Sequence, residues 1–507
     1  MGTCAAGGRF KLNRIPARRA LTRTMLSILL GHSYFLRLDR KQWRRAKPYP
    51  PLATLQVAAR LRALGHRVAF FDAMLADGIG EYQRQLHTLA PQLVLLYEDN
   101  YNFLTKMCLQ RMREAACRMI AEARRGGARV IAAGSDATDE PEPYLAAGAD
   151  AVLAGEGIGA LEVLLQRLDD CPSVGSPELS QGVEGVTSRS SDAAAVRPGA
   201  RRIPPARGEL PPPAWDLIDV AGYRGIWRQA HGRFSLNMAA SRGCSFRCAW
   251  CAKPIWGNHY LQRPAAEVAA EMTRIKCELA PDHIWFADDI FGFRVDWVHE
   301  FADALAASGG AIPFTIQTRA DLISERMAQA LRAAGCQEAW LGAESGSQRV
   351  LDAMNKGIRV EEIHTARARL GAAGIRVGFF IQLGYLGEEL PDILATRKLI
   401  VSARPDDVGV SVAYPLPGTR FHELVSEQLG AKTHWQASGE LAMMFPGTYT
   451  TPFYREVRDL LHEEVQLAGR REARRSLQRR WDRLLARQDS FLNTPPRPAA
   501  AAAVGLP

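Results

Sequence analysis

Ser241-Arg242-Gly243-Cys244-Ser245-Phe246-Arg247-Cys248-Ala249-Trp250-Cys251 is the segment on which the predicted fold of this chain depends. Its three cysteines have the spacing Cys-x3-Cys-x2-Cys. Three thiolates can hold an iron–sulfur cluster and leave one iron without a protein ligand. Such an iron can bind a substrate or cofactor, whereas a fully thiolate-ligated cluster mainly carries electrons. The segment therefore predicts a cluster held by Cys244, Cys248 and Cys251.

Zinc is the alternative that these residues leave open. A structural zinc site is closed by four ligands and usually pairs two Cys-x2-4-Cys or His arms. The nearest additional ligands are His259 and Cys277, and neither completes a familiar zinc spacing. Disulfides are not expected, because no secretory signal is visible and nine cysteines in 507 residues do not form a disulfide scaffold.

The length and charge of the chain limit its organisation. A chain of 507 residues is too long for one core, so two or three domains are expected. The net charge of +10 comes largely from residues 1–24 and from the arginine-rich C-terminal region. Residues 1–24 are predicted to be a disordered basic leader, although their composition also resembles a transit peptide. No apolar run is long enough to span a membrane, so no transmembrane segment and a cytoplasmic location are expected.

Residues 25–170 alternate short apolar runs with helical patterns. The predicted strands are Met25–Leu30, Arg67–Phe71, Gln92–Tyr97, Arg129–Ala133 and Ala151–Ala154. Predicted helices include Leu52–Leu64, Leu104–Arg125 and Ala160–Leu168. This alternation indicates βαβ units and an α/β, Rossmann-like domain whose parallel sheet is covered on both faces. Such sheets bind ligands beyond the carboxyl ends of their strands.

Residues 171–215 are predicted to be a linker, because they are rich in Ser, Pro, Gly, Ala and Arg with little apolar periodicity. A second alternation of strands and helices fills residues 216–430. Its predicted strands are Phe234–Ala239, His283–Phe286, Phe314–Gln317, Glu338–Leu341, Val377–Ile381 and Val408–Ala413. The cysteine segment follows the first of these strands, which is where sites in β/α barrels are built.

The cysteine segment, with the aromatic Trp250 before its third cysteine, resembles the signature of the radical S-adenosylmethionine (SAM) enzymes. Four segments at later strand ends resemble the SAM-binding and barrel-end motifs of that family: Phe286–Phe291, Gly342–Ser347, Phe380–Glu388 and Tyr414–Thr419. The resemblance covers nearly all of residues 216–430. It implies a partial (β/α)6 barrel and a 4Fe-4S cluster whose open iron binds SAM.

The resemblance also indicates which side chains would bind SAM. The candidates are Trp250, Asp288, Glu344, Ser345, Gln382, Gly384, Gly387 and Tyr414. Acids and hydroxyls can bind the ammonium and hydroxyl groups of SAM, and glycines let backbone approach the nucleoside. Each of these residues, taken alone, is also typical of strand ends, helix caps and turns.

Residues 25–170 resemble the cobalamin-binding domain that precedes many radical SAM domains. The matching pieces are Pro48–Leu52, Leu64–Val68 and Ala154–Gly157. The cobalamin-binding residues that this implies are Tyr49, Pro51, Leu52, Gly134, Ser135, Gly155, Glu156 and Gly157. The Asp-x-His-x-x-Gly motif, whose histidine ligates cobalt from below, is absent. We therefore expect cobalamin without a lower histidine, and an empty domain is the alternative.

Residues 431–490 are predicted to be a helical C-terminal region, and residues 491–507 a disordered tail. The helical region carries many arginines interleaved with leucines and Trp481. A basic amphipathic helix can bind nucleic acid or an anionic membrane surface. A solvated cationic face is the favoured interpretation, because no nucleic-acid module accompanies the helix. A nucleic-acid partner is therefore not expected.

The resemblance implies that the chain cleaves SAM to a 5′-deoxyadenosyl radical. The favoured reaction is cobalamin-dependent C-methylation of a biosynthetic substrate. The alternatives are a radical cyclisation or oxidation without methyl transfer, and a non-catalytic iron–sulfur protein that binds SAM or cobalamin. The expected partners are a small-molecule or lipid-like substrate and an electron donor such as flavodoxin or ferredoxin.

Overall fold

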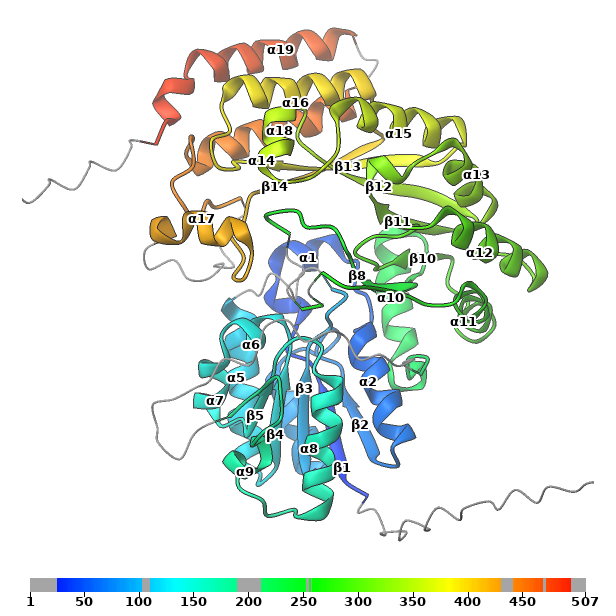
Figure 1. Ribbon diagram of the computed structural model, residues 1–507, viewed down its shortest axis with the longest axis vertical. Coiled ribbons are helices and arrows are strands. Elements are labelled where there is room, and N and C mark those ends of the chain that lie inside the picture. Colours follow the sequence, from blue (N-terminus) through cyan, green and yellow to red (C-terminus); the bar gives the residue numbers. More distant parts are fainter. Residues whose placement is uncertain are drawn as a thin grey trace, which may run out of the picture.

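The computed structural model describes residues 25–102, 110–188, 211–251, 255–256, 258–429, 441–467 and 471–493 (Figure 1). The predicted basic leader 1–24 lies outside the described residues, as do most of the predicted tail and residues 189–210 of the predicted linker. Among the helices described, none is both long and apolar enough to cross a lipid bilayer.

The first sheet has the strand order β2-β1-β3-β4-β5-β6. Its strands are β1 (Ser27–Gly31), β2 (Arg67–Phe71), β3 (Leu93–Tyr97), β4 (Arg129–Ala133), β5 (Ala151–Leu153) and β6 (Val186–Thr187). The first five strands pair in parallel, and β6 adds an antiparallel edge. All five residues of β3 are buried, as expected for a strand covered on both faces.

Two apolar cores cover the two faces of this sheet. Alternate strand residues such as Leu95 and Ile131 pack with α2 (Leu52–Ala63) and α8 (Ile158–Asp170) in the larger core. The residues between them, such as Val94 and Val130, belong to a separate core. That core also contains side chains from α3 (Ile79–Leu89), α5 (Gln110–Arg125) and α7 (Pro141–Ala147). The two-residue alternation of the strands therefore divides the domain into two cores.

The structure differs from the prediction between residues 171 and 188, which were expected to belong to the linker. These residues form α9 (Ser176–Ser180) and β6, so the first sheet continues into this region. A two-residue strand is too short to produce a recognisable apolar pattern.

The second sheet has the order β14-β13-β12-β11-β10-β7 and is parallel throughout. Its strands are β7 (Ser235–Met238), β10 (His283–Phe286), β11 (Phe314–Thr318), β12 (Cys336–Glu344), β13 (Arg376–Leu383) and β14 (Asp407–Val412). In the described strands β7 and β14 are the two edges and do not pair with each other, so the barrel is open. A two-stranded ribbon of β8 (Ser241–Gly243) and β9 (Tyr260–Gln262) follows β7.

Helices cover the outer face of the second sheet (Figure 1). They are α11 (Ala265–Glu278), α12 (Val295–Ala307), α13 (Glu325–Ala333), α15 (Val360–Ala372) and α16 (Leu390–Ala403). The C-terminal α18 (Thr451–Gln466) packs on α16, and α19 (Arg471–Ala486) packs on α18. Strand residues on the outer face, such as Leu341 and Phe379, are fully buried. Residues on the inner face, such as Trp340 and Phe380, are only half-buried.

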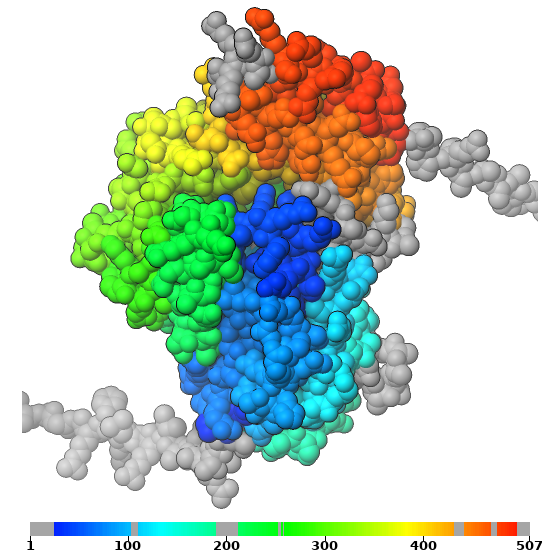
Figure 2. Space-filling view, turned by 180° about the vertical axis from the view of Figure 1, so that it is seen from behind, coloured from blue at the N-terminus to red at the C-terminus, as the bar shows by residue number. Residues whose placement is uncertain are grey.

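The loops at the carboxyl edge of the first sheet lie against the second domain (Figures 1 and 2). The carbonyl of Pro50 accepts a 3.0 Å hydrogen bond from Asn237 Nδ2 on β7. The carbonyl of Pro48 accepts a 2.7 Å bond from Trp227 Nε1 on α10 (Val220–His231). The larger apolar core contains residues of both domains. The domains therefore share one core.

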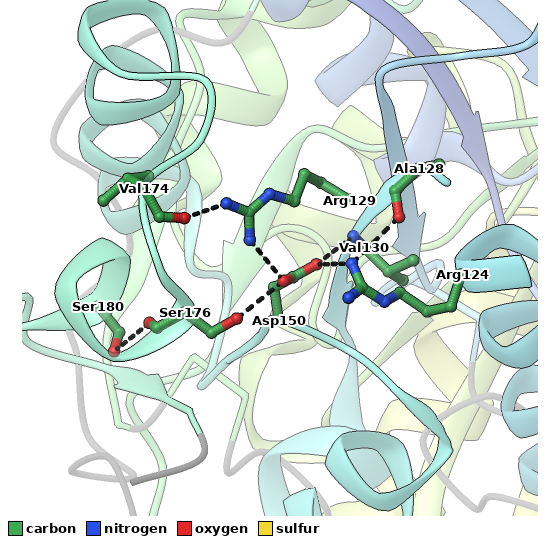
Figure 3. A network of polar contacts seen from close by, with 8 residues as sticks. All are labelled: Arg124, Ala128, Arg129, Val130, Asp150, Val174, Ser176 and Ser180. Atoms are coloured by element: carbon green, nitrogen blue, oxygen red, sulfur yellow. Dashed lines mark hydrogen bonds and ion pairs between the residues drawn. The ribbon is translucent and has the colours of Figure 1, made fainter. Parts of the chain in front are cut away.

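Asp150 anchors the opposite edge of the first sheet (Figure 3). Its carboxylate is 2% exposed and accepts bonds from Arg124 Nη1 (3.1 Å), Arg129 Nη1 (2.8 Å), Val130 N (2.8 Å) and Ser176 Oγ (2.8 Å). These donors come from the end of α5, from β4 and from α9. The buried charge is therefore compensated, and it ties three elements together.

Replacing Asp150 by Asn should lower the free energy of unfolding by about 3 kcal/mol, because both arginines lose their counter-charge. This value is at the lower end of the range for breaking a buried ion pair, because the Arg124 and Arg129 side chains are 41% and 21% exposed. Urea denaturation measures it. The control Asp216→Asn breaks an exposed pair with Arg62 and should cost less than about 1 kcal/mol. Equal losses in the two variants would contradict the assigned role of Asp150.

Candidate functional site

The loop that carries Cys244, Cys248 and Cys251 connects β8 to β9, and we name it the cysteine loop. Gly243, the last residue of β8, pairs with Tyr260 and has φ +74°. A Cβ at this position would lie 2.3 Å from the carbonyl oxygen of His259. Only glycine fits so close an approach at positive φ. The ribbon therefore fixes the base of the loop directly before Cys244.

Backbone contacts from two other elements hold the loop. Ala249 N donates to the carbonyl of Met354 (2.8 Å), and Phe421 N on α17 (Arg420–Leu429) donates to the carbonyl of Ala249 (2.9 Å). Asn355 Nδ2 donates to the carbonyl of Arg247 at 2.8 Å. The loop is therefore held on the side of the barrel where β12 and β14 end.

The donor set of the loop fits a cluster. Cys244 is buried, Cys248 and Cys251 are half-buried, and none of the three forms a disulfide. In the part of the chain that the structure describes, no three His, Cys, Asp or Glu side chains converge on one point as a single metal ion requires. A cluster places its three thiolates on three different irons.

Arg319, which the sequence analysis missed, lies against the cysteine loop from the end of β11. Its Nη1 is 3.6 Å from the sulfur of Cys248, and its guanidinium carbon is 3.7 Å from the ring centre of Phe246. Asp321 accepts two bonds from it, at 2.9 and 3.0 Å. Arg319 therefore places a fixed positive charge beside the sulfur of Cys248. A single arginine after a strand gives no sequence signal for this role.

Glu344, a predicted SAM-binding residue, forms a buried ion pair with Lys356 at 2.7 Å. Glu344 ends β12 after a register shift and has φ +61°, an unusual value for a non-glycine residue. The ammonium of Lys356 lies 5.8 Å from the ring centre of Trp250 in the cysteine loop. The pair therefore lies next to the cysteine loop. Lys356 was not among the predicted residues.

Three buried polar atoms, in the cysteine loop and in or after β13, have no hydrogen-bond partner among the described residues. They are Trp250 Nε1, Gln382 Oε1 and Glu388 Oε1. Gln382 lies on β13, the strand that pairs with β12 beside Glu344. Burial raises the pKa of Glu388 to about 8, and its other oxygen accepts a bond from Gly384 N. Buried polar atoms without partners are costly, which indicates a site for a polar ligand.

Other predicted SAM-binding residues make different contacts. Both carboxylate oxygens of Asp288 accept from Ala240 N, and Ser241 Oγ also donates to this carboxylate. Burial raises the pKa of Asp288 to about 7. Ser345 Oγ lies 3.1 Å from Thr396 Oγ1 on α16. Asp288 thus positions the strand before Cys244, and Ser345 contacts an outer helix; their binding of SAM stays a prediction.

Two further predicted residues lie in loops after strands. The carbonyl of Gly387 accepts a 2.8 Å bond from Arg349, on the exposed side of the loop after β13. Tyr414 follows β14 and packs, half-buried, against the shared core. Their binding of SAM stays a prediction.

The first group of predicted cobalamin-binding residues joins the two domains. The hydroxyl of Tyr49 lies 3.1 Å from Ser235 Oγ on β7, and its ring lies 5.2 Å from that of Trp227. Pro51 and Leu52 are buried at the start of α2. These residues therefore hold the segment between the two sheets, at the carboxyl edge of the first.

The second group lies on loops after β4 and β5. Gly134 and Ser135 begin α6 (Ser135–Asp139), and Gly157 begins α8. Glu156 is buried; its side chain pairs with Arg242 on β8, and its carbonyl accepts a 2.6 Å bond from Tyr97. A Cβ on Gly155 would lie 3.1 Å from the carbonyl oxygen of Ile255. The 155–157 loop therefore touches the chain on both sides of the three cysteines.

Two histidines of the first domain, His32 and His66, lie directly after β1 and directly before β2. His32, after β1, is buried with Nε2 3.2 Å from Asp72 Oδ1. His66 precedes β2, at the opposite edge of the sheet. The expectation of cobalamin without a lower histidine stays a prediction.

A directional row of hydrogen bonds crosses the inner face of the second sheet. Thr315 Oγ1 donates to Glu338 (3.3 Å), so it must accept from His283 Nε2–H (2.9 Å). His283 Nδ1 then accepts from Ser235 Oγ (2.9 Å), which in turn accepts from the Tyr49 hydroxyl (3.1 Å). Burial lowers the pKa of His283 to about 3, so the ring is neutral, as this pattern requires. Sequence reasoning missed the row because its members come from five separate segments.

Comparison with known proteins agrees with this geometry. The sequence model of the Radical SAM superfamily matches residues 238–400. An uncharacterized methyltransferase of Pyrococcus horikoshii is 28% identical over 294 residues, which cover 57% of this chain and 60% of that relative. The match thus spans less than two thirds of the relative's own length.

Two solved structures share the fold. The radical SAM methyltransferase TsrM from Kitasatospora setae, with cobalamin and a [4Fe-4S] cluster bound, has a TM-score of 0.64 at 18% identity, over 82% of this chain and 77% of that one. The cobalamin-dependent radical SAM enzyme OxsB, with aqua-cobalamin and SAM bound, has a TM-score of 0.60 at 17% identity, over 82% and 57%. Residues 238–400 of this chain are therefore a radical SAM domain, within the fold of cobalamin-dependent radical SAM enzymes.

Proposed function

We propose that this chain is a radical SAM enzyme that methylates a carbon atom of a small-molecule substrate with the help of cobalamin. The observation that carries the proposal is the contact between the 155–157 loop and the cysteine loop, through the Glu156–Arg242 pair and the approach of Gly155 to Ile255. It brings a ligand-binding edge of the first sheet to the cysteine loop. Two cofactors on these loops would face one reaction site.

Cys244, Cys248 and Cys251 would hold the cluster, and the loops after β4 and β5 would hold cobalamin. When bound, the cluster supplies the electron that splits SAM, and cobalamin supplies a methyl group. Arg319, held by its two bonds to Asp321, would place its positive charge beside the sulfur of Cys248.

The Glu344–Lys356 pair would recognise the amino-acid end of SAM. Its carboxylate and ammonium match the ammonium and carboxylate of the methionine part. The unpartnered atoms Trp250 Nε1 and Gln382 Oε1 offer one donor and one acceptor to the rest of the ligand. In this proposal the chain orients SAM with the charges of Glu344 and Lys356, which are buried and already paired with each other.

Tyr101 and Trp256 would shield the reaction from water at the junction of the domains. Their rings lie 5.3 Å apart, and both side chains are buried. Tyr101 follows β3 of the first sheet, and Trp256 follows the cysteines. A dry site protects a radical from quenching by side reactions.

Changing Cys244, Cys248 and Cys251 together to Ala should remove all bound iron and sulfide, because no other ligand set replaces the three thiolates. Iron and sulfide analysis after anaerobic reconstitution measures the loss, from about four of each per chain to none. Cys277, which is exposed and away from the loop, provides the matched control, and Cys277→Ala should keep its cluster. Stoichiometric zinc without sulfide in the wild type would overturn the proposal.

Glu344→Gln should weaken SAM binding by about 10- to 100-fold, because a charge-assisted bond to the ammonium is lost. Equilibrium dialysis of the reconstituted protein measures the affinity, and iron content should not change. The double variant Glu344→Gln, Lys356→Met removes both buried charges and separates lost binding from the cost of an unpaired Lys356. Glu361→Gln on α15 is the control. Wild-type affinity in Glu344→Gln would remove Glu344 from the SAM site.

The reconstituted chain should retain added hydroxocobalamin, with an absorption spectrum that His32→Ala leaves unchanged, because His32 is bound to Asp72. Gel filtration followed by spectroscopy measures the retained corrin. His87, in the last turn of α3, gives the matched control His87→Ala. A histidine-ligated spectrum that disappears in His32→Ala would refute cobalt without a histidine. If no corrin is retained, methyl transfer from cobalamin is excluded.

A further inference from the structure

Arg319 directs one nitrogen of its guanidinium at the sulfur of Cys248. The residue directly follows β11 and is 5% exposed. Its Nη1 lies 3.6 Å from Cys248 Sγ, which is a hydrogen-bond distance for an atom as large as sulfur. The edge formed by Nε and Nη2 donates to the two carboxylate oxygens of Asp321, at 2.9 and 3.0 Å. In a planar guanidinium this edge lies opposite Nη1, so the acid and the sulfur are on opposite sides of the arginine.

Two further contacts fix the orientation of this guanidinium. Its central carbon lies 3.7 Å from the ring centre of Phe246 in the cysteine loop. The ring of Phe246 packs edge-to-face on that of Phe293, at 5.8 Å. Nη2 also donates to the carbonyl of Lys356 at 2.8 Å. One edge, one face and one further N–H of the side chain are therefore held, and the N–H that remains points to Cys248.

The carbonyl of Lys356 belongs to a segment that contacts both proposed ligand sites. Its neighbours Met354 and Asn355 bind the backbone of the cysteine loop, at 2.8 Å each. The side chain of Lys356 forms the buried pair with Glu344. Arg319 thus connects a predicted cluster ligand to the segment that carries the lysine of the proposed SAM site.

The charges around Arg319 make it one half of a dipole. Asp321 compensates its charge, but from the side remote from Cys248, so the positive end of the dipole faces the sulfur. Lys356 is a second cation near the loop, and its charge is compensated by Glu344. The direct polar contact of Cys248 with this arginine is therefore a charged N–H donor.

We propose that Arg319 raises the reduction potential of the cluster through its hydrogen bond to Cys248. The oxidised [4Fe-4S]2+ cluster takes up one electron from an external reductant and becomes [4Fe-4S]+, so negative charge increases on the cluster and its sulfur ligands. A charged donor stabilises the reduced form more than the oxidised form, and hydrogen bonds to the sulfurs are one of the factors that set such potentials. The proposal rests on the proposed function in one respect, namely that Cys248 holds the cluster.

An anaerobic redox titration of the reconstituted chain, with dithionite as reductant and without SAM, tests the proposal. Electron paramagnetic resonance measures the reduced cluster. Arg319→Met removes the N–H donor, so at one fixed solution potential its ratio of reduced to oxidised cluster should be about tenfold lower than in the wild type. For a one-electron couple this is a shift of about 59 mV. The control Arg326→Met breaks an exposed pair with Asp296 and should titrate like the wild type.

A second variant separates the hydrogen bond from the charge of Asp321. Arg319→Met leaves that carboxylate without its partner, and an uncompensated negative charge would itself lower the potential. The double variant Arg319→Met, Asp321→Asn removes this charge and should still have a reduced-to-oxidised ratio at least about threefold below that of the wild type. A double variant that titrates like the wild type would overturn the proposal, because the acid would then explain the shift.

Arg319→Gln keeps an N–H donor but removes the charge. Because charge-assisted hydrogen bonds are roughly twice as strong as neutral ones, this variant should lose about half of the effect, a change of about threefold in the ratio. An unchanged ratio would contradict the proposal even where Arg319→Met binds no cluster. If neither variant binds iron and sulfide, Arg319 supports the loop and the proposed tuning is wrong.

The outcomes separate this proposal from the proposed function. If the wild type cleaves SAM and methylates a substrate, but Arg319→Met keeps the wild-type potential, the role of Arg319 fails and the proposed function stands. If the potential shifts as expected but no methyl transfer is found, the proposed function fails and the role of Arg319 stands.

Discussion

The ion pair between Arg242 and Glu156 is the contact on which the arrangement of the two proposed cofactor sites depends. Its side chains are 11% and 6% exposed, so the pair is almost dry. Arg242 lies two residues before Cys244, and Glu156 lies in the loop that ends the first sheet. Removing one partner would leave a buried charge, which is far more costly than breaking a surface pair. The pair therefore fixes the distance between a loop of one domain and the cysteines of the other.

Much of the fold could be predicted because buried parallel strands are continuous apolar runs. β2, β4 and β10 occur with the predicted bounds. The ribbon of β8 and β9 and the two-residue β6 were missed, since strands of two or three residues show no periodicity. The order of the strands in the second sheet follows their order in the chain, which the alternation of strands and helices implies.

The candidate site was predictable only in part. The cysteines are recognisable by spacing, and Glu344 by the glycines and serines around it. Lys356 and Arg319 were missed, because each acts on a residue far away in the sequence: Lys356 on Glu344, and Arg319 on Cys248. For Asp288, the strand-end position could be read from the sequence, but its bonds from Ala240 and Ser241 could not, and its binding of SAM stays a prediction. Spacing along a chain shows which groups are present, and packing decides which of them meet.

The division of the first domain into two cores has a consequence for the order of folding during synthesis. The separate core contains only residues between Leu29 and Val152. All of its residues have therefore been synthesised when less than a third of the chain has been made. The larger core includes residues as distant as Leu26 and Leu484. Since domains generally fold as units while the N-terminal part emerges first, one face of the first sheet can close early. Its other face is covered by α2 and α8, but these helices belong to the core that is shared with the second domain, so the nascent chain exposes apolar surface at the junction of the two domains until the second domain has been made.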